Sequence, residues 1–214
     1  MDKTLAWRRR FHFFGRFPAM NPNSNSAADA ELMRAVARRD ETAFDRLYEQ
    51  FSRPVFSMVV RIVRSHAEAE EILQEAFWQV WQSAVNYQSA LGTPFTWIVT
   101  IARRKAIDRL RANSRHLQRI VDAKGAGVDD DVVAPAGLIK VVADERALAV
   151  RAALKQLGVA ERRTIELAFF DGLTHPEIAE ALKQPVGTVK ARIRRGLHKL
   201  QTALARQRRG EELL

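Results

Sequence analysis

The 214-residue chain contains no cysteine, which excludes disulfide bonds and thiolate metal sites and suits a reducing cytoplasm. Its 10 glycines and 7 prolines are sparse, so long stretches can keep a helical period. No apolar run reaches the roughly 18 residues of a membrane span. The five histidines are spaced unlike metal ligands: His12, His66, His116, His175 and His198. We therefore expect an all-α protein without stable membrane insertion, metal or cofactor.

Acidic residues are also in deficit. The chain has 35 lysines and arginines against 25 aspartates and glutamates, a net charge of +10. This balance favours a polyanionic partner, nucleic acid first and an anionic membrane surface second. The sequence contains neither a nucleophile–base pair nor a phosphate-binding glycine loop, so we expect no enzyme activity. With 47% apolar residues, the chain can bury one or two helical cores.

Residues 174–200 predict two short helices joined by a tight turn. Thr174 is a good N-cap, Pro176 stands early in the first helix, and Glu177 completes a capping box. Residues 183–185, Lys-Gln-Pro, then end that helix, and a second helix starts near Val186.

The second helix has two sides at helical spacing. Its apolar residues are Val186, Val189, Ile193, Leu197 and Leu200. Its far side carries Thr188, Arg194, Arg195 and His198, with Lys190 and Lys199 on the flanks. This pattern predicts a helix-turn-helix with a basic recognition helix. The alternative is an ordinary helical hairpin with a solvated basic face.

The N-terminal 27 residues are basic and aromatic, then polar. We interpret them as a disordered or dispensable extension, with Met20 as an alternative start, or as an arm that touches DNA or membrane. A domain over residues 28–112 follows. Its first helix is expected to be capped by Asp29 and its second to start at Thr42, with Pro54 kinking or dividing the second.

Residues 67–85 form the most informative helix of this domain. One stripe is apolar: Ala69, Ile72, Leu73, Ala76, Phe77, Val80 and Ala84. The opposite side carries Glu68, Glu71, Glu75, Gln82 and Trp78, with Gln74 and Trp81 at its edges. An acidic surface around a tryptophan repels DNA and suits a protein-docking face. Packing of Trp78 inside the chain is the alternative.

After a polar loop at residues 86–92, Thr93 and Pro94 predict the start of another helix. The expected inward residues are Phe95, Val99, Ala102, Ala106 and Leu110. The expected outward residues are Trp97, Thr100, Arg104, Asp108 and Arg111, with Arg103, Lys105 and Arg109 alongside. Cations beside an accessible aromatic suit a strand with unstacked bases. A buried Trp97 with merely solvated cations is an equal alternative.

Residues 113–142 contain Gly125, Gly127, Pro135 and Gly137 and three successive aspartates, which predicts a flexible acidic linker. A second domain is expected over residues 143–205. It should begin with a helix ending at Leu157 and capped by Gly158, followed by a helix over 161–170 and a turn at Asp171-Gly172. Residues 206–214 are expected to be a fraying tail.

Three segments occur in a characteristic order: AEAEEILQEAFWQVW, TPFTWIVTIARRKAIDRLR and, after the linker, DGLTHPEIAEALKQPVGTVKARIRRGLHKL. From residue 29 to 205 the chain resembles the extracytoplasmic function (ECF) sigma factors of the sigma-70 family. The resemblance implies a cytoplasmic initiation subunit that binds core RNA polymerase, promoter DNA and an anti-sigma factor that releases it on a stress signal.

The resemblance also implies roles for particular residues. Docking on the clamp helices of the largest polymerase subunit falls to Glu71, Gln74, Glu75 and Trp78. Recognition and melting of the −10 element fall to the loop at 86–93 and to Trp97, Thr100, Arg104, Asp108 and Arg111. Readout of the −35 element falls to Thr188, Lys190, Ala191, Arg194 and Arg195.

The chain departs from the family pattern at three positions. Ile98 replaces the second of two tryptophans at the melting wedge of housekeeping members, which implies a weaker wedge. Arg104 stands where many members carry asparagine, so a phosphate contact is the safer expectation. Lys183 replaces the usual glycine of the turn, and a left-handed conformation there would cost about 1 kcal/mol. A stand-alone helix-turn-helix regulator remains the alternative function.

Overall fold

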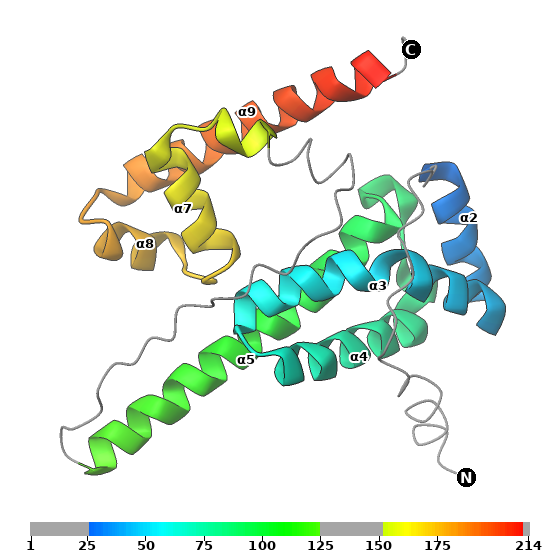
Figure 1. Ribbon diagram of the computed structural model, residues 1–214, viewed down its shortest axis with the longest axis horizontal. Coiled ribbons are helices and arrows are strands. Elements are labelled where there is room, and N and C mark those ends of the chain that lie inside the picture. The colour runs from blue at the N-terminus through cyan, green and yellow to red at the C-terminus, as the bar shows by residue number, and fades with distance from the viewer. Residues whose placement is uncertain (1–25, 125–151, 212–214) are drawn as a thin grey trace. The chain divides into compact units, whose positions relative to one another are not determined.

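The computed structural model describes residues 26–124 and 152–211, which are helical wherever they form regular structure, with no strand among them (Figure 1). The chain divides into two compact units on either side of residue 139. This confirms the expected all-α fold. Residues 1–25 of the predicted N-terminal extension and residues 125–142 of the predicted linker lie outside the described residues. None of the described helices is long and apolar enough to cross a membrane.

The N-terminal unit is a helical bundle. Its elements are α2 (Ser26–Ala37), α3 (Glu41–Val63), α4 (His66–Ser83), the 3-10 turns η1 (Ala84–Asn86) and η2 (Ser89–Leu91), and α5 (Pro94–Lys124). Helices α3, α4 and α5 pack against one another, and α2 packs against α3 and η1. The apolar stripe predicted on α4 forms much of the core, because all seven of its residues are buried.

The two helix starts predicted in this unit differ from those observed. Asp29 was expected to cap the first helix, but it lies inside the first turn of α2, 7% exposed, where its carboxylate accepts a hydrogen bond of 2.7 Å from the Gln50 amide. α3 starts at Glu41, one residue before the predicted Thr42, and Asp40 caps it, because its side chain accepts a 3.0 Å bond from the Ala43 N–H. Pro54 does not divide α3, which runs unbroken past it.

The start of α5 is as predicted, but its end is not. The Thr93 hydroxyl accepts a 3.3 Å bond from the Thr96 N–H, and Pro94 is the first helical residue. The helix then continues to Lys124 and extends past the rest of its bundle (Figure 1). Residues 113–124 are therefore helical where a linker was predicted, since no glycine or proline interrupts them before Gly125.

The C-terminal unit contains a helical segment at 152–155, then α7 (Val159–Phe169), α8 (His175–Ala181) and α9 (Val186–Glu211). Its central core consists of Leu167, Ile178, Ala179 and Val189, with Ala168, Leu173, Leu182 and Ile193 packed around them. Gly158 was predicted to end the preceding helix, but it is the N-cap residue of α7, in an extended conformation. Residues 206–211, predicted as a fraying tail, continue α9.

The buried stripe of α9 also differs from the prediction. Val189 is fully buried, but Leu197 is 53% exposed and Val186 is 37% exposed. The helix turns Gly196 toward α7 instead, where a Cβ atom on Gly196 would lie 2.6 Å from the Cδ1 atom of Ile165. A glycine in the middle of the stripe therefore permits the close approach of α7 and α9.

Candidate nucleic-acid interface

The helix-turn-helix forms as the sequence predicts. The Thr174 hydroxyl accepts a 3.5 Å bond from the Glu177 N–H, and the Glu177 carboxylate accepts a 2.5 Å bond from the Thr174 N–H. Lys183 has the left-handed conformation, with φ of 50°. The Gln184 N–H donates across the turn to the Ala179 carbonyl at 2.9 Å. This closing hydrogen bond helps to hold a turn that lacks the usual glycine.

Helix α9, the predicted recognition helix, begins directly after this turn. The Pro185 carbonyl accepts bonds from the N–H groups of Thr188 and Val189, at 2.9 and 3.2 Å. Burial of Val189 turns the opposite side of the helix outward. The predicted −35 residues Lys190, Ala191, Arg194 and Arg195 are exposed on that side, and Thr188 is partly buried. The structure therefore places the five residues on one side of a single helix.

An ion pair ties this helix to α7. The Lys199 ammonium lies 2.8 Å from the Glu161 carboxylate, whose side chain is 12% exposed. The same carboxylate accepts a 3.2 Å bond from the Gly158 N–H. The hydrogen bond from Lys199 and the backbone bond lower the pKa of Glu161. Glu161 thus joins the start of α7 to α9.

In the N-terminal unit, the predicted −10 residues also follow one side of a helix. Thr100, Arg104, Asp108 and Arg111 are exposed along α5, and Trp97 is partly buried near its start. The Arg104 guanidinium lies 4.0 Å from the Asp108 carboxylate, with both side chains mostly exposed. Such an exposed pair adds little stability, so the Arg104 guanidinium can move to another anion at small cost.

Trp97 contacts the loop that precedes α5. Its ring centroid lies 5.8 Å from that of Tyr87, and the Tyr87 hydroxyl donates a 2.9 Å bond to the Gly92 carbonyl. Burial and the nearby Asp29 carboxylate raise the pKa of Tyr87. Val85 and Leu91, at the two ends of the loop, are 72% and 82% exposed. The loop therefore combines a tethered aromatic pair with exposed apolar side chains.

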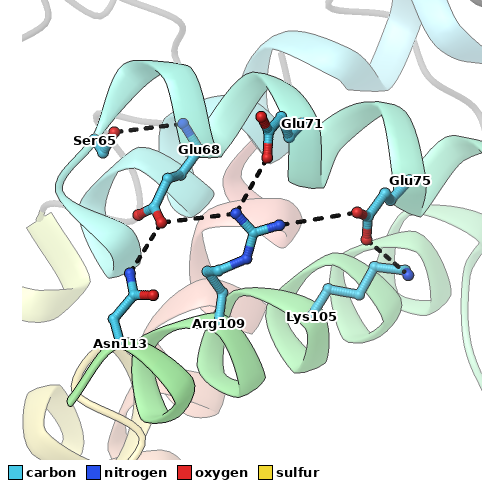
Figure 2. A network of polar contacts seen from close by, with 7 residues as sticks. All are labelled: Ser65, Glu68, Glu71, Glu75, Lys105, Arg109 and Asn113. Carbon is cyan, nitrogen blue, oxygen red and sulfur yellow. Dashed lines mark hydrogen bonds and ion pairs between the residues drawn. The ribbon is translucent and has the colours of Figure 1, made fainter. Parts of the chain in front are cut away.

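The side of α5 that carries Lys105 and Arg109 faces α4 and is paired with it. Figure 2 shows Arg109 and Lys105 of α5 pointing at the acidic side of α4. The Arg109 guanidinium lies 3.1 Å from Glu71, 3.6 Å from Glu68 and 3.9 Å from Glu75. Lys105 lies 3.2 Å from Glu75, and the Asn113 amide donates to Glu68 at 2.9 Å. The hydrogen bond to Glu71 raises the pKa of Arg109, so this cation stays charged.

This network changes the interpretation of the predicted docking residues. Glu71 and Glu75 belong to the acidic face, yet each is already paired within the chain. Their side chains remain 65% and 52% exposed, so a second cation can still approach them. Gln74 and Trp78 are partly buried. Partial burial fits both docking and internal packing of Trp78, and its docking role stays a prediction.

The sequence does contain the signal for this network. Lys105, Arg109 and Asn113 recur every four residues on one helix, and three glutamates recur at spacings of three and four residues on another, so each set lies along one helix face. The spacing within one helix does not show which other helix it faces, so the sequence pattern alone does not pair these two faces.

The inward side of α5 differs in part from the prediction. Ile98, Ala102 and Ala106 are fully buried, whereas Phe95 is 36% exposed and packs against Phe51 with ring centroids 5.5 Å apart. Ile98 therefore belongs to the core, whereas Phe95 and the partly buried Trp97 both remain accessible near the start of α5.

Two family profiles match the sequence. Residues 47–116 match Sigma-70 region 2, and residues 147–200 match Sigma-70, region 4. The ECF RNA polymerase sigma factor SigK of Mycobacterium tuberculosis is 37% identical over 185 residues, covering 86% of this chain and 96% of that protein. SigK of a Mycobacterium sp. is 36% identical over 173 residues, covering 81% of this chain and 89% of that protein.

Among solved structures, SigE of Rhodobacter sphaeroides, in complex with the anti-sigma ChrR, is 30% identical, with a TM-score of 0.43. It covers 84% of this chain and 99% of its own. RpoE of Bartonella quintana, in complex with the anti-sigma factor NepR, is 20% identical, with a TM-score of 0.37 over 76% of this chain and 96% of its own. The two family profiles in order, together with relatives matched over nearly their whole length, show that the chain belongs to the ECF sigma factors of the sigma-70 family.

Proposed function

We propose that the chain directs core RNA polymerase to promoters with a −35 and a −10 element, and that its two basic helices divide this work. The observation that carries the proposal is the different surroundings of α9 and α5. The outer face of α9 carries exposed Lys190, Arg194 and Arg195, whereas α5 keeps one exposed stripe and has its other flank occupied by α4.

Readout of duplex DNA suits α9. A single helix fits the major groove, where arginine and lysine donate to guanine acceptors and to phosphates. Ala191 stands between the cations and offers a small apolar contact to a thymine methyl group. Thr188 lies near the start of α9, where backbone N–H groups favour a phosphate. These five residues are the −35 surface of the proposal.

Capture of a melted strand suits the start of α5 and the loop before it. Trp97 offers a ring on which an unstacked base can stack, and the stripe Thr100, Arg104, Asp108 and Arg111 continues from it along the helix. Arg104 can exchange its weak pair with Asp108 for a phosphate. Asp108 itself repels phosphate, which fits a contact with a base amino group.

Docking on the clamp helices of the largest polymerase subunit falls to Glu71, Gln74, Glu75 and Trp78. The two glutamates remain more than half exposed while paired, which supports recruitment of basic side chains from a partner. As an ECF sigma factor, the chain is also proposed to be held by an anti-sigma factor until a stress signal arrives. The polymerase, in this proposal, carries the chemistry.

The test is run-off transcription on a library of genomic fragments, with core polymerase alone and with the full chain added. New discrete start sites are expected only with the chain, and the aligned upstream sequences should share two elements. A Trp78→Ala variant should lose polymerase binding. If the chain binds fragments by itself and directs no initiation, it is a stand-alone regulator and the docking assignment is wrong.

A further inference from the structure

Arg39 is unusual in its backbone and in its side-chain contacts. It lies in the turn between α2 and α3 with φ of 69°, the left-handed region that glycine usually occupies at a helix end. The Arg39 N–H donates to the Val36 carbonyl at 2.9 Å, and the Asp40 N–H donates to the Ala35 carbonyl at 3.2 Å. These bonds close α2, and a glycine would make them with less strain.

The side chain of Arg39 makes contacts that a glycine at this position could not make. One Nη atom of Arg39 donates to the Trp81 carbonyl, and the other lies 3.4 Å from the Gln82 carbonyl. The guanidinium also lies over the Trp81 ring, 5.4 Å from its centroid. Trp81 in turn packs edge-on against the buried ring of Phe44, with ring centroids 5.2 Å apart. The turn is thereby tied to the end of α4.

A cation at the end of α4 is favourable. The helix has no basic residue in its own last turn, and its final carbonyls carry partial negative charge that a cation stabilises. Arg39 supplies that charge from a different part of the chain. The contact is specific to arginine, because a planar fork can reach two carbonyls while stacking on an indole.

The position of this contact matters because the loop at 84–92 starts where α4 ends. η1 follows α4 directly and packs against α2. The loop then carries Tyr87, which contacts Trp97, and ends at Gly92. Arg39 therefore holds the start of the loop, through the last carbonyls of α4, and the Tyr87–Gly92 hydrogen bond holds its end.

We infer that Arg39 is a positioning residue for base capture: its guanidinium holds the last carbonyls of α4 and so sets the loop at 84–92 against Trp97. The inference rests on the proposed −10 role of this loop. Arg39 itself contacts no base. Its loss loosens the loop and lowers the discrimination between bases, while docking on the polymerase is unaffected.

Two variants separate this role from simple stability of the turn. Arg39→Gly removes the guanidinium but adopts a positive φ readily, so α2 keeps its end. Arg39→Lys keeps a cation that can stack on Trp81 but cannot form the fork. Arg38→Ala is the matched control, because Arg38 is the neighbouring cation and pairs with Glu31, at 3.7 Å.

The experiment uses polymerase holoenzyme assembled with each full-length variant and a single-stranded oligonucleotide pool with a randomised −10 segment between fixed flanks. Bound strands are sequenced, and the preference for the best base over the next is measured at each position. Arg39→Gly should lower this ratio by about two- to fivefold, the range expected for a cation at a helix C-terminus. Arg38→Ala should match the wild type, and Arg39→Lys should fall between.

Unchanged base preference with Arg39→Gly overturns the inference. A uniform loss of binding across all sequences with a shallower salt dependence would make Arg39 a phosphate contact instead. A loss of affinity for core polymerase, followed by fluorescence anisotropy, would place Arg39 in the docking surface. If the wild-type holoenzyme shows no base preference, the −10 assignment itself fails and the inference falls with it.

Discussion

The two units use basic helices in different ways. In the C-terminal unit, α9 has one described ion pair to another helix, between Lys199 and Glu161, and its outer face stays exposed. In the N-terminal unit, Lys105 and Arg109 of α5 face the carboxylates of α4, and exposed cations remain on the opposite stripe. Positive charge on a helix is therefore not by itself a binding site. Which flank the neighbouring helices neutralise decides where nucleic acid can approach.

The difference extends to the cores. The N-terminal unit buries aromatic and aliphatic residues from four helices, whereas the central core of the C-terminal unit consists of four buried aliphatic residues with partly buried ones packed around them. A smaller core leaves less margin for loss of a single side chain. We therefore expect the unit that contains α9 to be the less stable of the two.

The largest expected effect tests that fragility. Ile178→Ala removes a fully buried side chain from the C-terminal core and should destabilise this unit by about 2–5 kcal/mol. Hydrogen exchange on the full chain should show lost protection in α7–α9 and unchanged protection in α3–α5. Leu197→Ala, at a 53% exposed position, is the control and should change stability by about 0.5 kcal/mol or less. Equal loss of protection in both units would show that they do not unfold separately.

The next prediction concerns the α4–α5 network. Arg109→Ala leaves Glu68, Glu71 and Glu75 without their shared cation and should destabilise the N-terminal unit by about 1–2 kcal/mol, because three carboxylates then repel one another. Urea unfolding measures the loss, which added salt should reduce. Arg104→Ala, which removes a cation that is 85% exposed, should have almost no effect. Similar losses for the two variants would contradict the contrast between the flanks of α5.

A stabilising change is expected in the turn of the helix-turn-helix. Lys183→Gly relieves a left-handed lysine and should stabilise the C-terminal unit by up to about 1 kcal/mol. The midpoint of its thermal unfolding should rise. Lys190→Gly is the contrasting variant, since it places glycine inside α9 and should lower the midpoint. A lower midpoint for Lys183→Gly would show that the lysine side chain stabilises the turn.

The smallest effect is a change in pH dependence. The folded C-terminal unit lowers the pKa of Glu161, so this group contributes stability above its ordinary pKa and loses that contribution as the pH falls through the lowered value. Glu161→Gln should therefore reduce the loss of stability on acidification below about pH 4.5. Unfolding midpoints of α7–α9 between pH 3 and pH 7, roughly the range in which carboxylates titrate, measure it. If Glu161→Gln and the wild type lose stability equally on acidification, the pair between Glu161 and Lys199 is not formed in solution.

Sequence periodicity predicted the buried stripe of α4 and the exposed stripe of α5, and the residue types at its start predicted the capping box of α8. Each of these features depends on residues within or next to one helix. The failures have a different origin. Gly196 replaced Leu197 in the α9 stripe because α7 approaches closely there, and helix pattern alone does not reveal a neighbour. The α4–α5 ion pairs and the Arg39 contact join segments far apart in sequence. The end of α5 was missed because a polar helix continued past the core without an apolar stripe to mark it.

The central claim is that α9 reads duplex DNA while Trp97 and its loop act on the melted strand. The direct test compares two templates: a full duplex promoter, and a template that lacks the −35 segment and is already melted at −10. An Arg194→Ala/Arg195→Ala variant should initiate about tenfold or more weakly on the first and like the wild type on the second. Trp97→Ala should be defective on both. A defect of the double variant on the truncated template, or wild-type behaviour of Trp97→Ala on it, would contradict the division of work.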